Sequence, residues 1–458
     1  MKQSLLHRLI DVLVQVSSSL GLNVELCRLE EMAVMVHRIM SYQGRQFHTL
    51  EHVFSFLDHA DGVTTLAAIF HDLVYLQVDG GLPADAVTLL SPYVGPSKAG
   101  FSFNTPAIQN DRAFQLCCAL FGRDPEKPEI PAGAMNEFLS ALLMYRTLQD
   151  CVPPPVLLAV AVCVEASIPF RGPNSEGRSM AEVLDYRLQG MVDRGLITTS
   201  REDREAMVHR AVAFANVDVQ DFCLDDAAAF LSNTWKLLPE TNFPLRIGGA
   251  FTAREYRIAL LNMYGFFHSL RPENIYHQYR GEPDSATMDE LTEKAHRNLN
   301  YALQYLRAKL VAVGVIEAIA ELSGGDAPLA LFLGDIPLNG EETESLWDHL
   351  APSKPVEFLD ENHPVLRLLR DGRVERSPFD LQNSPLALWL YRGLKSAQWA
   401  RLNSLSSDYF TGKRTPADLL LALPEAQRRD LLSACAEMVP TRRDRLKNLM
   451  DPRSIENP

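Results

Sequence analysis

The sequence contains no uninterrupted apolar run of the ~20 residues that a helix needs to cross a bilayer. Its first residues also lack the pattern of a secretory signal peptide, in which a basic stretch precedes an apolar one. These two absences argue against a membrane-spanning protein and predict a cytoplasmic location. No long low-complexity block is present, and hydrophobic residues make up 47% of the chain against 22% charged residues. This balance predicts a compact globular protein.

Several motifs of known chemistry are also missing. The seven cysteines form no CxxC pair and no zinc-finger spacing, so we expect reduced and mostly buried thiols. The chain has neither a P-loop nor a GxSxG elbow, which disfavours nucleotide triphosphate hydrolysis of that type and serine hydrolase chemistry. Positive charge is scarce as well. The formal net charge of -14 argues against broad binding to nucleic acids or anionic membranes, although one local basic pocket can still hold a phosphate.

Strand-like alternation is scarce, and apolar residues recur at helical spacing through most of the chain. We therefore predict an all-α, multi-helical fold. Helices are expected at roughly 3–20, 26–41, 49–60, 63–77, 107–121, 134–148, 155–168, 179–194, 201–215, 252–270, 287–322, 362–370, 384–400 and 415–437. The segment 329–335 fits either a short strand or a buried helix. We place a domain boundary near 245, which gives an N-terminal helical domain over 1–245 and a helical C-terminal region over 246–458.

Three histidines and one aspartate within 25 residues form the most informative pattern. They lie in the stretches Phe47-His48-Thr49-Leu50-Glu51-His52 and Phe70-His71-Asp72-Leu73-Val74-Tyr75. His48 and His52 are four residues apart, so a helix starting near Thr49 would present both on about the same face. The doublet His71-Asp72 lies inside an otherwise apolar run, 66–75, within the helix predicted over 63–77. An ionised Asp is costly to bury there without a compensating ion or hydrogen bonds. The pattern predicts half of a metal site in a groove between two helices.

These two stretches resemble the HD-domain superfamily of metal-dependent phosphohydrolases, in particular the branch with a [YF]HTxxH motif followed by FHDxVY. The similarity covers roughly residues 35–170. Cyclic nucleotide phosphodiesterases carry a related HNxxH motif followed by HD. The resemblance implies an all-α phosphodiesterase-like bundle, with His52, His71 and Asp72 as ligands of a divalent ion and His48 as the proton donor.

The fourth ligand of this family is an Asp on a later helix, and two residues of this chain are candidates. Glu165 matches the expected position and is the only charged group in its apolar stretch, 160–168. A longer carboxylate there could reach the same ion, although Glu165 could instead pair with Arg171. Asp218 is the alternative, with a helix cap or turn as its ordinary role.

The resemblance implies hydrolysis of a phosphomonoester or phosphodiester, for which a nucleotide is one candidate substrate. The ion would be manganese, cobalt, nickel, magnesium, zinc or iron. Phosphate charge calls for cations, so Arg45 and Arg171 are predicted to contact the substrate, with Tyr75 as a hydrogen-bond partner in the pocket. The alternative to an enzyme is a catalytically silent module of the same fold that binds a nucleotide or has a regulatory role. A non-haem iron oxygenase would need more ligands than the sequence offers.

No motif of known chemistry occurs in the C-terminal half. Its helices are predicted to pack against the first half, as a lid over the substrate or as a surface for homo-oligomer formation. The expected partner is a small phosphorylated molecule.

Overall fold

The computed structural model describes residues 3–456 apart from 98–99, 105–107, 109, 128–134, 337–342, 354 and 358. The predicted all-α class is confirmed. Within the described residues, β-structure amounts to one antiparallel hairpin of two four-residue strands and a few isolated bridges. All seven cysteines are free thiols, and four of them are buried, as the spacing predicts.

The chain forms two compact units and passes between them more than once. The first unit comprises residues 1–223 and 270–295, and the second comprises 224–269 and 296–458. We call residues 270–295 the return segment, because the chain comes back to the first unit there. The sequence predicts one boundary near residue 245. In the structure the chain changes units after residues 223, 269 and 295.

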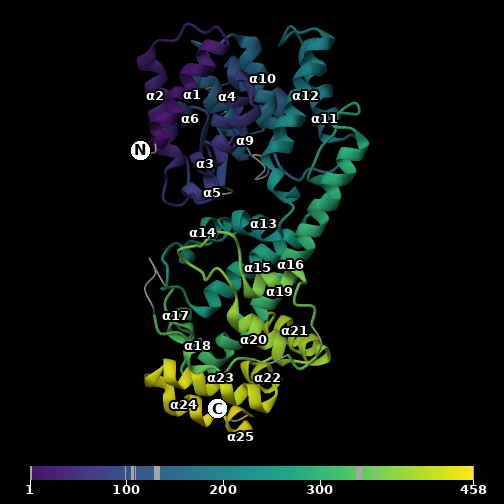
Figure 1. Cartoon of the computed structure of the whole chain (residues 1–458). Coiled ribbons are helices and arrows are strands. Elements are labelled where there is room, and N and C mark those ends of the chain that lie inside the picture. Colours follow the sequence, from purple (N-terminus) through teal and green to yellow (C-terminus); the bar gives the residue numbers. More distant parts are fainter. Residues whose placement is uncertain are drawn as a thin grey trace. The chain divides into compact units, whose positions relative to one another are not determined.

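The first unit is built from the helices and the hairpin of the N-terminal part (Figure 1). Its elements are α1 (Leu5–Ser19), α2 (Leu26–Met40), α3 (Leu50–Ser55), η1 (Leu57–His59), α4 (Gly62–Phe70), α5 (Leu76–Asp79), α6 (Val87–Leu90), β1 (Val94–Ser97), β2 (Gly100–Phe103), α8 (Arg112–Phe121), α9 (Met135–Leu148), α10 (Pro154–Ala166), α11 (Met180–Asp193), α12 (Arg201–Asp218), η2 (Gln220–Cys223) and η4 (Pro272–Asn274), the η elements being 3-10 helices.

Helix α10 lies at the centre of the first unit. It is apolar on all sides, and every residue from Leu157 to Ala166 is buried. A helix of this kind has no solvent face, so other helices must surround it. Helices α4, α9, α11 and α12 pack against it. Glu165 is its only charged residue and is 2% exposed. This arrangement brings the ends of α4 and α12 near one another around a common core.

Two predicted helices end earlier than expected. Helix α3 begins at Leu50, with Thr49 as its N-cap, so His48 precedes the helix and only His52 lies on it. Helix α4 ends at Phe70, and the doublet His71-Asp72 therefore lies just beyond the helix rather than inside it. The expectation that each pair shares a helix was wrong, because both segments turn at the site.

The second unit contains the remaining helices and most of α16. Its elements are α13 (Ala227–Thr234), α14 (Leu237–Thr241), η3 (Phe243–Arg246), α15 (Ala253–Ser269), α16 (Ser285–Ser323, of which 285–295 belong to the return segment), α17 (Leu329–Leu333), α18 (Leu346–His349), α19 (Pro364–Arg370), α20 (Pro385–Gly393), α21 (Ser396–Phe410), α22 (Pro416–Leu421), α23 (Glu425–Met438), η5 (Pro440–Arg442), α24 (Arg443–Asn448) and α25 (Pro452–Glu456). In the segment 329–335, residues Leu329–Leu333 form helix α17, and Gly334 then makes an isolated antiparallel bridge with Ser345.

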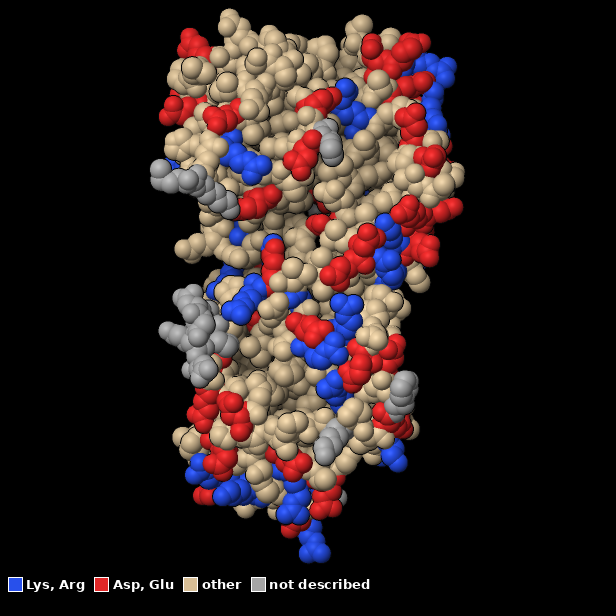
Figure 2. All heavy atoms as spheres, in the orientation of Figure 1, with Lys and Arg blue, Asp and Glu red and all other residues tan. Residues whose placement is uncertain are grey.

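On the face drawn in Figure 2, acidic and basic side chains are interspersed over each unit, and no broad basic field is visible there. This agrees with the expectation from net charge. Among the described helices, none combines the length and the apolar character needed to span a bilayer.

Candidate metal centre

Three elements of the first unit bring two imidazoles and two carboxylates together. His52 comes from α3, and His71 and Asp72 follow α4. Asp218 is the last residue of α12. The side chain of His71 is 1% exposed, and those of His52, Asp72 and Asp218 are 11%, 19% and 16% exposed. The four groups are therefore mostly withdrawn from water but remain accessible from one side.

The distances between these atoms are those of ligands around one ion. The Nε2 atom of His71 is 2.9 Å from Asp72 Oδ2 and 3.6 Å from Asp218 Oδ1. The Nε2 atom of His52 is 3.8 Å and 3.3 Å from the same two oxygens. Metal bonds of about 2.1 Å at angles of 90–110° separate neighbouring ligand atoms by about 3 Å to 3.5 Å. The ligand atoms of His52, His71 and Asp218 all lie within 4.8 Å of one another, so one divalent ion could reach these three with small shifts. Asp72 Oδ2 lies beside both imidazoles but outside this group of three.

Both Nε2 atoms are buried, and neither forms a well-aligned hydrogen bond with any residue that the structure describes. The Asp72 Oδ2 atom lies 2.9 Å from the Nε2 atom of His71 as an ion-pair contact. The Nδ1 atom of His71 lies 2.9 Å from the carbonyl oxygen of Ala68, which can only accept. Nδ1 therefore carries the hydrogen, and Nε2 of the neutral ring keeps its lone pair. This is the tautomer that a metal-binding histidine needs.

The electrostatics of the cluster favour a positive charge at its centre. Burial alone lowers the pKa of His71, but the carboxylates of Asp72 and Asp218 outweigh it and hold this pKa well above its usual value. Burial raises the pKa of both carboxyl groups, yet the facing imidazoles hold both below their usual range. A cation is thus stabilised here, whether it is a proton or a metal ion.

Arg45 fixes the turn that carries the doublet. Its guanidinium pairs with Asp79 at 2.7 Å and donates to the backbone oxygens of Asp72 and Leu73. The side chain is fully buried. The charge of Arg45 is thus balanced inside the protein, and its contact with substrate stays a prediction. Its role is to position the turn after α4.

The return segment fixes the end of α12, where Asp218 lies. Asn216 donates to the carbonyl oxygen of His277 and accepts from its backbone N–H, each at 2.8 Å. The hydroxyl of Tyr276 donates to the carbonyl oxygen of Val219 at 3.2 Å. These bonds flank Asp218 on both sides and hold its backbone in place.

Glu165 lies outside the cluster and is occupied elsewhere. Its carboxylate pairs with Arg171 and Arg187, each at 2.8 Å. Two guanidinium groups satisfy this buried charge, so no ion is needed to compensate it. The structure thus favours Asp218, the alternative fourth ligand, over Glu165. Glu165 was preferred because its sequence position matches that of the expected Asp. Its ion pair with Arg187 depends on how α11 packs, which the sequence position does not show.

His48 and Tyr75 lie next to the cluster. The His48 ring centroid is 4.7 Å from that of Tyr75 and 6.1 Å from that of His52. Both residues are partly exposed. Their predicted roles as proton donor and as a hydrogen-bond partner for substrate remain predictions that this geometry permits.

Comparison of the chain with known protein families, with curated proteins and with solved structures gives no match. The interpretation of the site therefore depends on its own geometry.

Glu137 is a residue that sequence reasoning missed. It lies on α9, about one helical turn before Ser140, whose hydroxyl accepts a hydrogen bond from the backbone N–H of Val74 in the turn after the doublet. Burial raises the pKa of Glu137 to about 7, and the Asp72 carboxylate adds to this effect. A lone acid in an otherwise apolar stretch was the available signal.

Arg171 lines a polar cleft of about 900 Å³ in the first unit. Three other arginines line the same cleft, together with residues 276–281 of the return segment. Since Arg171 is 24% exposed beside its partner Glu165, a contact with substrate remains a prediction.

Proposed function

We propose that the chain is a metal-dependent phosphohydrolase whose divalent ion is held by His52, His71, Asp72 and Asp218. The observation that carries the proposal is the pair of buried Nε2 atoms, set between two carboxylates from separate elements and without a well-aligned hydrogen bond to any described residue. The order of the four residues along the chain is the one that the resemblance to HD phosphohydrolases implies.

The donor set fits a divalent transition metal. Two imidazoles with two carboxylates suit manganese, iron, cobalt, nickel or zinc better than magnesium, which prefers oxygen ligands. When bound, such an ion supplies a Lewis acid that polarises a phosphoryl oxygen and activates water for attack.

The residues around the ligands supply the other functions of a hydrolase. His48 can give a proton to the leaving oxygen, since an imidazole suits proton transfer near neutral pH. The ring of Tyr75 lies against His48 and orients it. Phe56 and Phe214 stack on each other and contact the ring of His71, which limits the access of water from that side.

Metal analysis of purified variants tests the ligand set. We expect one stoichiometric divalent ion in the wild type, and we expect Asp218→Asn and His71→Ala to lose it. Glu165→Gln is the matched control: we expect it to keep the ion although it is less stable, because Arg171 and Arg187 lose the carboxylate that balances their charges. Retention of the ion in Asp218→Asn with loss in Glu165→Gln would overturn the assignment.

A panel of phosphomonoesters and phosphodiesters, assayed with each candidate metal, tests the reaction. Hydrolysis that disappears in His48→Ala while the ion stays bound supports the proposed roles. Binding of nucleotides without release of phosphate or nucleoside would favour a silent regulatory module instead.

A further inference from the structure

The second unit contains a cavity that the metal centre does not involve. It has a volume of about 70 Å³, which is several times the space of one water molecule, and its walls are mainly apolar. Helix α16 contributes Lys309, Ala312, Val313 and Ile316, which recur at one helical face. Phe251 and Leu329 also line it. Lys309 is the only charged residue that α16 contributes to the wall.

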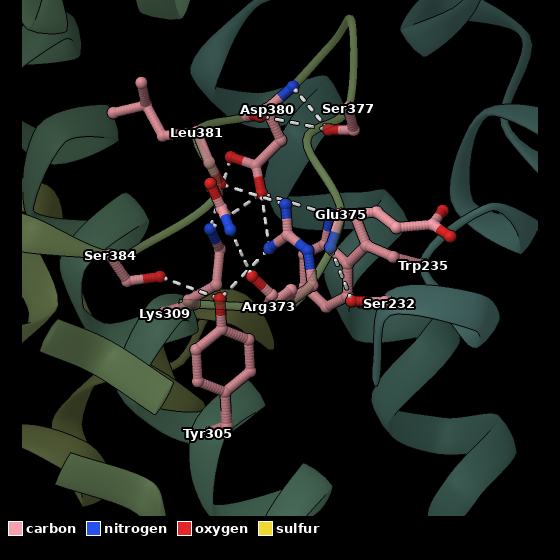
Figure 3. Close-up of polar contacts among 11 residues, drawn as sticks. Ser232, Trp235, Tyr305, Lys309, Arg373, Glu375, Ser377, Asp380, Leu381 and Ser384 are labelled. Carbon is pink, nitrogen blue, oxygen red and sulfur yellow. Dashed lines mark hydrogen bonds and ion pairs between the residues drawn. The ribbon is translucent and has the colours of Figure 1, made fainter. Parts of the chain in front are cut away.

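Figure 3 shows a buried charged cluster whose members Lys309, Asp380 and Ser384 also line this cavity. Lys309 pairs with both carboxylate oxygens of Asp380, at 3.0 Å and 3.2 Å. Arg373 and the indole N–H of Trp235 also donate to Asp380. Tyr305 accepts from Arg373 and contacts the hydroxyl of Ser384. None of these side chains is more than 9% exposed.

The cluster carries one excess positive charge. Two cations, Lys309 and Arg373, face a single carboxylate, whose pKa they hold below its usual value against the effect of burial. Asp380 already accepts from three side chains. A buried charge without a partner is costly, so the excess calls for an anion.

Among the described residues at the cavity, two buried hydrogen-bond donors can still accommodate a further acceptor. The ammonium group of Lys309 has three hydrogens, and its hydrogen bonds go only to the two oxygens of Asp380. The hydroxyl of Tyr256, which also lines the cavity, is buried and faces Asp380, but it forms no well-aligned hydrogen bond with any described residue. Burial and then the Asp380 carboxylate raise the pKa of Tyr256, so it stays a donor at neutral pH.

We propose that this cavity binds a small organic monoanion with an apolar body, such as a straight-chain carboxylate, whose charged head is received by Lys309 and Tyr256. One excess charge matches a monoanion better than a phosphate, which carries nearly two negative charges at neutral pH. The narrow apolar walls fit an alkyl chain of a few carbon atoms.

Calorimetric titration with straight-chain carboxylates of increasing length, and with alcohols and amines of the same lengths, tests this site. We expect the affinity for carboxylates to rise about fourfold per methylene until the chain fills the cavity. The matching alcohols bind at least tenfold more weakly, and the amines do not bind. Alcohols that bind as tightly as carboxylates, or no binding in the millimolar range, would overturn the proposal.

Variants locate the head and the chain of the ligand. Lys309→Met should lower carboxylate affinity about tenfold to a hundredfold and leave alcohol binding unchanged. Ala312→Trp, which fills the cavity, should abolish both. Lys236→Met is the matched control, because this lysine of the same unit is 41% exposed and pairs with Glu375 at the surface. Unchanged carboxylate binding in Lys309→Met would contradict the proposal.

Two further experiments test the same site without the Lys309→Met variant, which could fail to fold. Tyr256→Phe removes one hydroxyl and should weaken carboxylate binding several-fold. Crystals of the wild type soaked with a terminally brominated hexanoate should show anomalous bromine scattering among Phe251, Ile316 and Leu329. Bromine bound only at other places would overturn the site.

Discussion

At the scale of single residues, the proton on His71 and the proposed metal ion compete for the same atom. Because Asp72 and Asp218 hold the pKa of His71 well above its usual 6.5, the metal-free site is protonated near neutral pH. Metal affinity should therefore rise about tenfold per pH unit below this raised pKa and level off above it. Calorimetry in buffers of different ionisation enthalpy measures the released proton. Binding without proton release would contradict this account.

The same proton sets the stability of the metal-free protein. A raised pKa in the folded state means that the contribution of His71 is fully present below the unfolded value near 6.5 and is lost as pH rises through the folded pKa. Saturating metal should remove this loss, and chemical denaturation at a series of pH values measures the difference.

Protonation of Glu137 should also make the stability of the folded protein depend on pH. Its pKa rises from 4.5 to about 7, so the folded protein holds a proton that the unfolded chain releases, and stability falls as pH rises between these values. Glu137→Gln should therefore stabilise the protein above neutral pH, by a few kcal/mol at most. Urea denaturation at acidic and neutral pH measures this. Glu126→Gln, an exposed acid nearby, serves as the control and should change little.

The sequence predicted three of the four proposed ligands, because these three lie in short sequence motifs. His52, His71 and Asp72 lie in two short motifs, whereas the fourth ligand depends on which later carboxylate the packing brings back. Glu165 and Asp218 could be told apart only by their partners: two arginines hold Glu165, and two imidazoles face Asp218.

At the scale of elements, the turn after α4 depends on Arg45. Arg45→Met leaves Asp79 buried without its partner and should cost about 3–5 kcal/mol in the free energy of unfolding. The double variant Arg45→Met/Asp79→Leu should recover most of this loss. Lys127→Met is the control, since its ion pair with Asp124 is exposed and contributes at most about 1 kcal/mol. Equal effects of the buried and the exposed substitution would contradict the assigned role.

The end of α12 gives a second prediction. Asn216→Ala removes both hydrogen bonds to His277 and should weaken metal binding about tenfold to a hundredfold, as loss of groups behind a ligand does. Helical circular dichroism should stay unchanged. Gln15→Ala, on an exposed face of α1, is the control. Metal affinity equal to that of the wild type would show that the return segment does not position Asp218.

Apolar periodicity predicted where most helices lie but not where the functional turns fall. The predicted helix over 63–77 stops at Phe70, and the backbone of the following turn bonds in part to Arg45 and to Ser140 of α9. The predicted helix over 384–400 is divided at Leu394, and the hairpin of β1 and β2 was not foreseen. These features depend on contacts between distant segments, which periodicity does not contain.

At the scale of the whole molecule, removal of metal should affect one unit only. An ion present at 100 times its dissociation constant stabilises the state that binds it by about 2.7 kcal/mol. Chelation should therefore lower amide protection against hydrogen exchange in α3, α4 and α12, and leave α17 and α20 unchanged. Mass spectrometry of exchanged peptides measures both units in one experiment. Equal loss of protection in the two units would contradict a site confined to the first.

The return segment has a consequence for synthesis. All four proposed ligands have been translated by residue 218, but residues 276 and 277, which hold the end of α12, follow only after 224–269 of the second unit. When the ribosome has synthesised residues 1–223, the first unit still lacks the hydrogen bonds from residues 276 and 277 to the end of α12. Part of the second unit, 224–269, is synthesised before these residues. A protein truncated at residue 245 would contain all four proposed ligands but would lack the hydrogen bonds from Tyr276 and His277. Tight metal binding should therefore begin late in translation.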